Sequence, residues 1–152
     1  MRRKEREITD ENIIKSIMQE ASVCRIALCK DNKPYIVPMS FGFRDNYIYL
    51  HSAQEGKKID ILKDNNDICF EVDIKDQLVK GEKPCNWTMK YYSVIGFGKS
   101  SFVEDINEKI DAMNIIMEKY SGRSDFEFPQ AALNKIAIIK IELDQITGKK
   151  SQ

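Results

Sequence analysis

A short stretch in the first half of the chain gathers side chains that can bind an anion. A strand-like run ends at His51 and Ser52, and Gly56 then leads into a helix that opens with Lys57 and Lys58. A hydroxyl, two ammonium groups and the free N–H groups of a helix N-terminus all favour a phosphate. The alternative is that the lysines form only a solvated helix start. Lysines are commoner at the other end of a helix, so the residues alone leave both interpretations open.

The preceding strand-like run could line a flat, apolar group. Pro38 has no N–H group and must lie at a sheet edge or a bulge, which leaves neighbouring backbone groups free for the edge of a ligand. A phosphate attached to a flat ring system describes flavin mononucleotide (FMN). An edge strand with nothing bound fits the run equally well. The candidate lining residues are Ile36, Val37, Pro38, Met39, Ser40 and Phe41.

His51 is the one histidine of the chain. A histidine beside an apolar strand is commonly a packed residue, but next to a phosphate site its imidazole could orient a substrate anion or donate a proton near neutral pH. Both roles stay open. Farther along, Trp87, Tyr91 and Tyr92 form an aromatic cluster, which is more typical of a barrel core or a dimer interface than of ring stacking on a ligand.

Composition excludes several classes of partner. Lysine plus arginine number 24 and aspartate plus glutamate also number 24, a balance that argues against nucleic-acid or anionic-membrane binding through bulk charge. No apolar run approaches the roughly 20 residues of a membrane span, and no secretion signal is visible, so we expect a cytoplasmic protein. No C-x-x-C pair is present. We therefore expect Cys24, Cys29 and Cys69 to be buried reduced thiols, and we expect no metal site.

The elements that would position these residues are short and alternate quickly. Turn clusters at hairpin spacing separate the first strands, which favours antiparallel neighbours over parallel winding. A polar segment, 75–86, is expected to be a loop, and the ends, about 1–8 and 149–152, are expected to be flexible. The expected strands are 23–29, 35–43, 47–51, 68–72, 87–103 and 136–143, and the expected helices begin at Thr9-Asp10-Glu11 and cover 56–65 and 106–120. The pattern predicts one domain, 1–152, built as a small antiparallel barrel with peripheral helices.

Four segments taken in order resemble a known family. VPMSFGF, YLHSAQEGKKID, CFEVD and YYSVIGFGKSSFVED resemble the pyridoxamine 5'-phosphate oxidase-like flavin-binding split barrels, in particular the branch that includes the 5-nitroimidazole reductases (Nim proteins). The resemblance runs from about residue 1 to residue 149, from the opening MRRKEREIT to the closing ITGK. Several linked motifs in the correct order make it more specific than any one of them.

The resemblance implies a mainly β fold, a six-stranded antiparallel split β-barrel that binds FMN at a homodimer interface. By motif position, residues 36–41 would line the isoalloxazine ring, and Ser52 and His51 would lie beside the ribityl phosphate, which Lys57 and Lys58 would hold. Tyr92 and Ser93 would reach the cofactor of the partner subunit. In the Nim branch the histidine at the position of His51 is linked to the active site.

The resemblance also has departures. The substrate-binding segment of true pyridoxamine phosphate oxidases is missing after residues 146–148, so pyridoxal phosphate synthesis is not expected. No nicotinamide motif is present, and NAD(P)H would dock transiently. The expected function is that of an FMN-dependent oxidoreductase that passes electrons to a small acceptor such as a nitroimidazole or another nitroaromatic. The alternative is a non-catalytic flavin or haem carrier, or a redox sensor, in which His51 could ligate haem.

Overall fold

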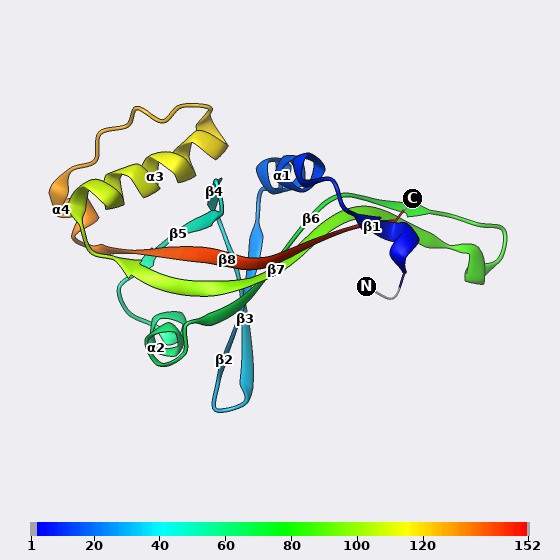
Figure 1. The fold of residues 1–152 in the computed structure, drawn as a ribbon, viewed down its shortest axis with the longest axis horizontal. Helices are drawn as coiled ribbons and strands as arrows, with labels where there is room; N and C mark the ends of the chain where they lie inside the picture. The colour runs from blue at the N-terminus through cyan, green and yellow to red at the C-terminus, as the bar shows by residue number, and fades with distance from the viewer. Residues whose placement is uncertain (1–2, 152) are drawn as a thin grey trace.

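A computed structural model describes residues 3–151 of the chain as one antiparallel sheet of eight strands with helices around it (Figure 1). The strands are β1 (Glu7–Ile8), β2 (Cys24–Lys30), β3 (Lys33–Met39), β4 (Gly42–Arg44), β5 (Tyr47–Ala53), β6 (Asp67–Val79), β7 (Thr88–Val103) and β8 (Ile136–Ser151). The helices are α1 (Glu11–Glu20), α2 (Lys57–Asp64), α3 (Ile106–Ser121) and α4 (Gln130–Leu133), with 3-10 turns η1 (Lys4–Arg6) and η2 (Pro84–Asn86).

The sheet curves into a barrel whose two end strands do not pair with each other. Its strands follow the order β3-β2-β6-β7-β8-β5-β4, with β1 paired to β8. β3 and β4 therefore lie at opposite ends of the path, although only Ser40 and Phe41 separate them along the chain. No ladder joins these two strands within the described sheet. The expected split barrel is confirmed.

The strand count differs from the expected six. The predicted strand 35–43 is broken in two, because the chain leaves β2 after Met39 and begins to pair with β5 at Gly42. The other addition is the two-residue β1, which pairs with Gly148 and Lys149 of β8. Residues 4–8 and 149–151, expected as loose ends, are thus η1, β1 and the end of β8. Residues 1, 2 and 152 lie outside the described residues.

Alternating side chains fill the barrel interior. On β2, Cys24, Ile26 and Leu28 are buried, and on β7 the inward positions include Gly96 and Gly98. A methyl group at Gly96 would meet the ring of the fully buried Phe70 and lie 2.6 Å from the carbonyl oxygen of Gln145. The glycine is therefore required by close approach, one of the roles expected for a glycine within a strand.

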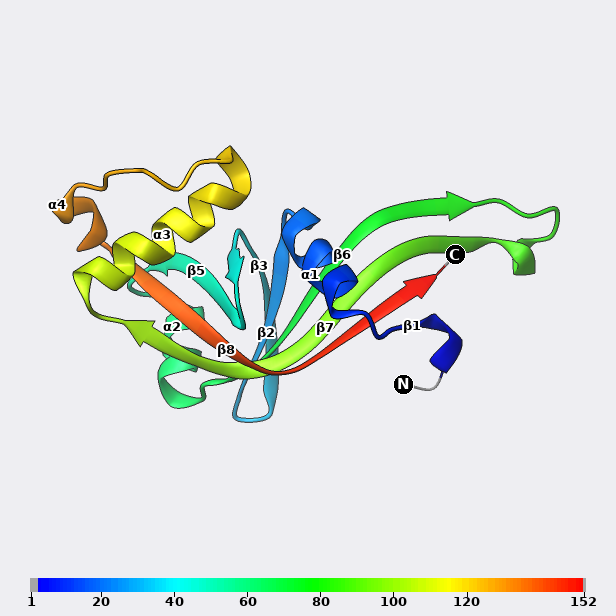
Figure 2. The ribbon, with the colours of Figure 1, turned by 45° about the horizontal axis from the view of Figure 1, so that its top comes forward.

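β6 and β7 continue beyond the barrel as a long hairpin arm (Figures 1 and 2). The predicted loop 75–86 is wrong in its first part, since Gln77, Leu78 and Val79 pair with Lys90, Met89 and Thr88. Polar residues extend the strand here because the partner strand supplies the hydrogen bonds. A bulge after Ile74, where Lys75 has a φ of 57°, separates the arm from the barrel ladder.

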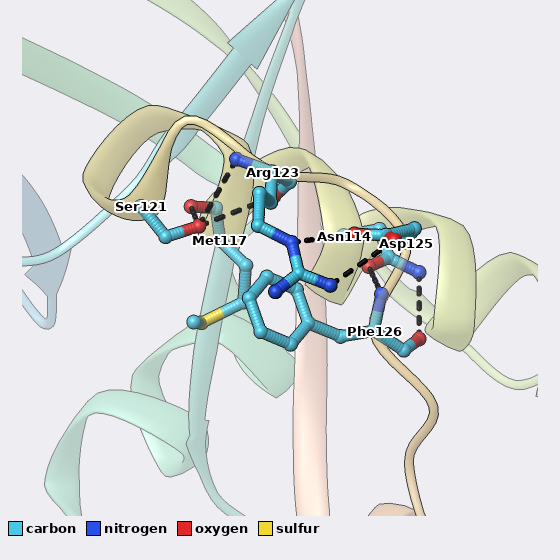
Figure 3. A network of polar contacts seen from close by, with 6 residues as sticks. All are labelled: Asn114, Met117, Ser121, Arg123, Asp125 and Phe126. Atoms are coloured by element: carbon cyan, nitrogen blue, oxygen red, sulfur yellow. Dashed lines mark hydrogen bonds and ion pairs between the residues drawn. The ribbon is translucent and has the colours of Figure 1, made fainter.

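The helices begin and end close to the predicted residues. The side chain of Asp10 caps α1 by accepting from the N–H of Asn12. α3 ends at Gly122, whose φ of 72° allows the left-handed turn. The segment after α3 is held by Asn114, whose amide both donates to the carbonyl oxygen of Phe126 and accepts from its N–H (Figure 3).

The thiols are less buried than expected. Cys24 lies in the core, where burial raises the pKa of its thiol to about 12. Cys69 is half-buried, but Cys29 is exposed, because the pleat of β2 turns it outward. All four thiols are free, and no group of candidate metal ligands occurs within residues 3–151. Within the same residues, no helix is long and apolar enough to cross a membrane.

The close contact at Gly96 gives a testable prediction for stability. Gly96→Ala should lower the free energy of unfolding by about 1–3 kcal/mol, because the added methyl group overlaps Phe70 and the backbone of β8. Ser101→Ala, on the exposed side of the same strand, is the control and should change it by less than about 0.5 kcal/mol. Urea unfolding measures both. Equal stabilities for the two variants would contradict the packing described for Gly96.

Candidate functional site

β3 offers a free edge and an exposed outer face. It pairs with β2 on one side, and no described strand pairs with its other side. Along the predicted lining segment, Ile36, Pro38 and Ser40 are exposed, whereas Val37 and Met39 are half-buried and pack against the core. Phe41, at the end of the segment, is fully buried. Alternate side chains of the segment, rather than all six, are therefore available to an outside group.

The two lysines at the start of α2 lie against β3. The Nζ atom of Lys58 is 3.1 Å from the Sδ atom of Met39. The Nζ atom of Lys57 lies 4.6 Å from the centroid of the Tyr35 ring. The fold thus brings the predicted phosphate-binding cations to the strand that was predicted to line a ring system.

The charge of Lys58 is not neutralised. Burial lowers the pKa of its ammonium group, and no carboxylate within the described residues forms an ion pair with it. The N-terminus of α2 likewise has no side-chain cap, and Gly56, its N-cap residue, has a φ of 120°. A desolvated cation beside free helix N–H groups is an arrangement that a phosphate would stabilise. These donors fit the phosphate of FMN.

His51 and Ser52 point to opposite faces of β5. His51 is exposed on the outer face, where it pairs with Ile138 of β8, and Ser52 is half-buried on the inner face, opposite Ala137. No hydrogen bond links either residue to the lysines of α2 in the described part of the chain. A group lying flat on the outer face of β5 would contact the imidazole and not the hydroxyl.

Tyr92 and Ser93 lie away from β3 within one chain. Both are on β7, and β2 and β6 separate that strand from β3. Tyr92 lines a pocket of about 380 Å³ between α1 and β6, together with Ile13 and Ile74. Ser93 is buried between Asp73 of β6 and Lys149 of β8.

The outer face of the sheet carries an apolar row that our reading of the sequence missed. Ile36, Ala27, Cys69 and Phe97 stand in register across β3, β2, β6 and β7. Ile36 is 61% exposed and Phe97 is 51% exposed. The signal in the sequence was the alternation of large residues with Gly96 and Gly98, since a strand that turns glycines inward turns its large residues outward.

The row beside it has apolar residues at its two ends and charged residues between them. Pro38, Arg25, Glu71 and Ile95 are in register, and Ile95 is 42% exposed. The guanidinium group of Arg25 lies 3.0 Å from a carboxylate oxygen of Glu71 and also pairs with Asp73. Together, Ile36, Ala27, Cys69, Phe97 and Ile95 form what we call the outer apolar face.

Solved structures share this fold. A protein from Bacteroides thetaiotaomicron VPI-5482, provisionally named a 5-nitroimidazole antibiotic resistance protein, is 35% identical, with a TM-score of 0.85 over 95% of this chain and 86% of that chain. The FAD and heme binding protein of Mycobacterium smegmatis has a TM-score of 0.87 at 15% identity, over 97% of this chain and 74% of that chain. At that identity the second likeness shows the fold alone.

A curated relative and a family model also match. An uncharacterized protein of Rhizobium meliloti (strain 1021) is 30% identical over 56 residues, which are 37% of this chain and 36% of that protein. The chain therefore spans about a third of the length of this relative. The model described as pyridoxamine 5'-phosphate oxidase matches residues 10–150, which cover nearly the whole chain. The chain belongs to the pyridoxamine 5'-phosphate oxidase family.

Proposed function

We propose that the protein is an FMN-dependent oxidoreductase that passes electrons to a small acceptor, a nitroimidazole or another nitroaromatic. The observation that carries the proposal is Lys58, a partly desolvated cation without a carboxylate partner, at an uncapped helix N-terminus beside β3. The likeness to the B. thetaiotaomicron protein supports the choice of acceptor.

The phosphate of FMN binds at the start of α2 in this proposal. Lys58 supplies a charge-assisted contact, which contributes about 1.5–3 kcal/mol when the acceptor is ionised. Lys57 lies over Tyr35 and adds positive charge at the same helix end. Ser52, half-buried on β5 four residues before Gly56, adds a hydroxyl.

The ring system lies over the outer side of β3. Ile36 and Pro38 are exposed there and offer an apolar surface, and the unpaired strand edge offers backbone N–H and C=O groups to the polar rim of the ring. The half-buried Val37 and Met39 pack the strand against the core, and Ser40 and Phe41 connect β3 to β4. When bound, FMN supplies the redox chemistry, and the protein supplies orientation, electrostatics and access.

His51 is the candidate proton donor to the acceptor. Its imidazole is exposed on the outer face of β5, where a small molecule can reach it, and a histidine can donate a proton near neutral pH. This role is a proposal about one residue and is separate from phosphate binding. An electron donor such as NADH or NADPH would dock transiently.

The proposed assembly is a homodimer. Ile36, Ile95 and Phe97 are between 42% and 61% exposed on one continuous sheet face, and exposed apolar patches of this kind mark interaction sites. A second copy is the occupant that such a face fits, because a two-fold axis would place the same residues against each other. In the dimer, Tyr92 and Ser93 of one copy approach the flavin of the other.

A haem or flavin carrier is the second candidate. The FAD and heme binding protein of M. smegmatis shares this fold, and the exposed His51 could serve as an axial ligand. The absorbance spectrum separates the candidates, because haem gives a Soret band and FMN gives bands in the blue and near-ultraviolet.

Anaerobic reduction of the FMN-loaded protein tests the function. We expect NADH or NADPH to bleach the flavin absorbance and a 5-nitroimidazole to restore it. Bleaching without reoxidation by any nitro compound would contradict the proposed acceptor. A protein that binds FMN but is never reduced by either nucleotide would favour a carrier or a different electron donor.

Loss of the half-buried cation should weaken phosphate binding. Lys58→Ala should raise the dissociation constant of FMN at least about tenfold, because it removes a charge-assisted contact. Lys63→Ala removes an exposed lysine from the last turn of the same helix and should leave the constant unchanged. Fluorescence titration of the apoprotein measures both. Unchanged affinity in Lys58→Ala would refute the phosphate assignment.

A charge on the outer apolar face should separate the subunits. Phe97→Asp should convert the dimer to a monomer, because a carboxylate would be buried without a partner. Asn107→Asp places the same charge at an exposed position of α3, which packs on β4 and β5, and should leave the dimer intact. Sedimentation velocity measures the mass of each variant. A dimer that survives Phe97→Asp would mean that the subunits associate through another surface.

A further inference from the structure

We propose that the hydroxyl of Tyr120 is a positioning group for the candidate flavin site: it ends the β2–β3 ladder and fixes the backbone where β3 gives way to β4. This inference rests on the proposed function, because it concerns the strand that would face the flavin. Tyr120 belongs to the last turn of α3 and lies far from Phe41 along the chain.

The hydroxyl bridges two backbone segments. Its oxygen accepts a hydrogen bond of 2.9 Å from the N–H of Phe41, and it donates one of 2.8 Å to the carbonyl oxygen of Ser22. Phe41 lies between β3 and β4, and Ser22 lies between α1 and β2. A single oxygen atom therefore satisfies one backbone donor and one backbone acceptor from different connections.

The register of the strands shows what the hydroxyl replaces. β2 and β3 pair from Lys30 and Lys33 up to Cys24 and Met39, and the register of that ladder, continued by two positions, would bring Ser22 opposite Phe41. At that position the N–H and C=O groups are joined through the hydroxyl instead of directly. A hydroxyl between them holds the two chains apart, so the ladder ends and the chain is free to turn toward β5.

The last turn of α3 is itself anchored. The Nζ atom of Lys119 donates to the carbonyl oxygens of Met18 and Gln19, at 2.7 Å and 2.8 Å. It also lies 4.2 Å from the centroid of the Phe41 ring. α1 has no basic residue in its own last turn, so Lys119 supplies the cation that its C-terminal carbonyl groups favour.

α3 also approaches β4 very closely. A methyl group at Gly42 would lie 2.8 Å from the backbone nitrogen of Ile116, so the helix backbone rests directly on the start of β4. With Lys119 on one side and Gly42 on the other, the position of Tyr120 relative to Phe41 is fixed by packing. The packing of α3 therefore holds the hydroxyl in place.

The connection to the flavin site runs through Met39. The ammonium group of Lys58 lies against its sulfur atom, two residues before Phe41. The end of β3 is thus held by Lys58 from α2 and by Tyr120 from α3. If the Phe41 backbone shifts, the exposed residues Pro38 and Ser40 and the position of Lys58 shift with it.

Tyr120→Phe removes only the bridging oxygen and keeps the ring. Hydrogen exchange of the flavin-free protein is the first measurement, because the N–H of the fully buried Phe41 then lacks a partner. We expect the peptide that contains Phe41 to exchange about tenfold faster than in the wild type. Unchanged exchange there would overturn the inference, whether or not the protein binds FMN.

The second measurement concerns the cofactor. In Tyr120→Phe we expect the dissociation constant of FMN to rise about tenfold and the reduction potential of bound FMN to shift. Ser121→Ala is the matched control, because it removes the next hydroxyl, which bonds to Met117 and Arg123 (Figure 3). The control should leave the dissociation constant, the potential and the exchange of the Phe41 peptide unchanged.

The outcomes separate the two proposals. A wild-type protein that binds no FMN refutes the proposed function, and the exchange of the Phe41 peptide still tests the bridge. A wild-type protein that binds FMN, with faster exchange but the same affinity and potential in Tyr120→Phe, overturns the positioning role. Equal effects of Tyr120→Phe and Ser121→Ala would also overturn it, because they would reflect a general loosening of α3.

Discussion

A sheet that bends round on itself must either join its last strand to its first or leave a row of backbone groups unpaired. Here β3 and β4 stand at the two ends of the strand order and are joined by only Ser40 and Phe41. The chain passes from one end of the sheet to the other without forming a ladder between them. The free edge of β3 is the result, and it is the part of the barrel that a flat ligand can use.

Helix termini supply the electrostatics around this gap. The N-terminus of α2 has no side-chain cap, and its Lys58 lies against Met39 at the end of β3, while the C-terminus of α1 is neutralised by Lys119 from α3. The N-terminus of α2 is open, whereas the C-terminus of α1 is occupied by the side chain of Lys119. The N-termini of α1 and α3, the helix ends that would favour an anion, are capped by the carboxylates of Asp10 and Asp105, so an added anion is expected beside α2.

The same strand serves the core and the surface. On β7, Gly96 makes room for Phe70 inside the barrel, and the neighbouring positions turn Ile95 and Phe97 outward. Because inside and outside alternate along a strand, the glycines that permit a tight core also leave a continuous apolar face for a second copy. Core packing and the proposed assembly are therefore coupled through one residue pattern.

The sequence by itself determined the strands and helices with strong periodicity and the position of Lys57 and Lys58 at a helix start, because these depend on neighbours along the chain. The split barrel was implied by the resemblance to a known family and not by a local pattern. The sequence did not determine the arm around Gln77 or the outward turn of Cys29, since ladder partners decide both. Only the tertiary structure placed Lys58 against Met39 and the hydroxyl of Tyr120 between Phe41 and Ser22. Contacts between distant segments depend on how the sheet closes, and no local pattern records that closure.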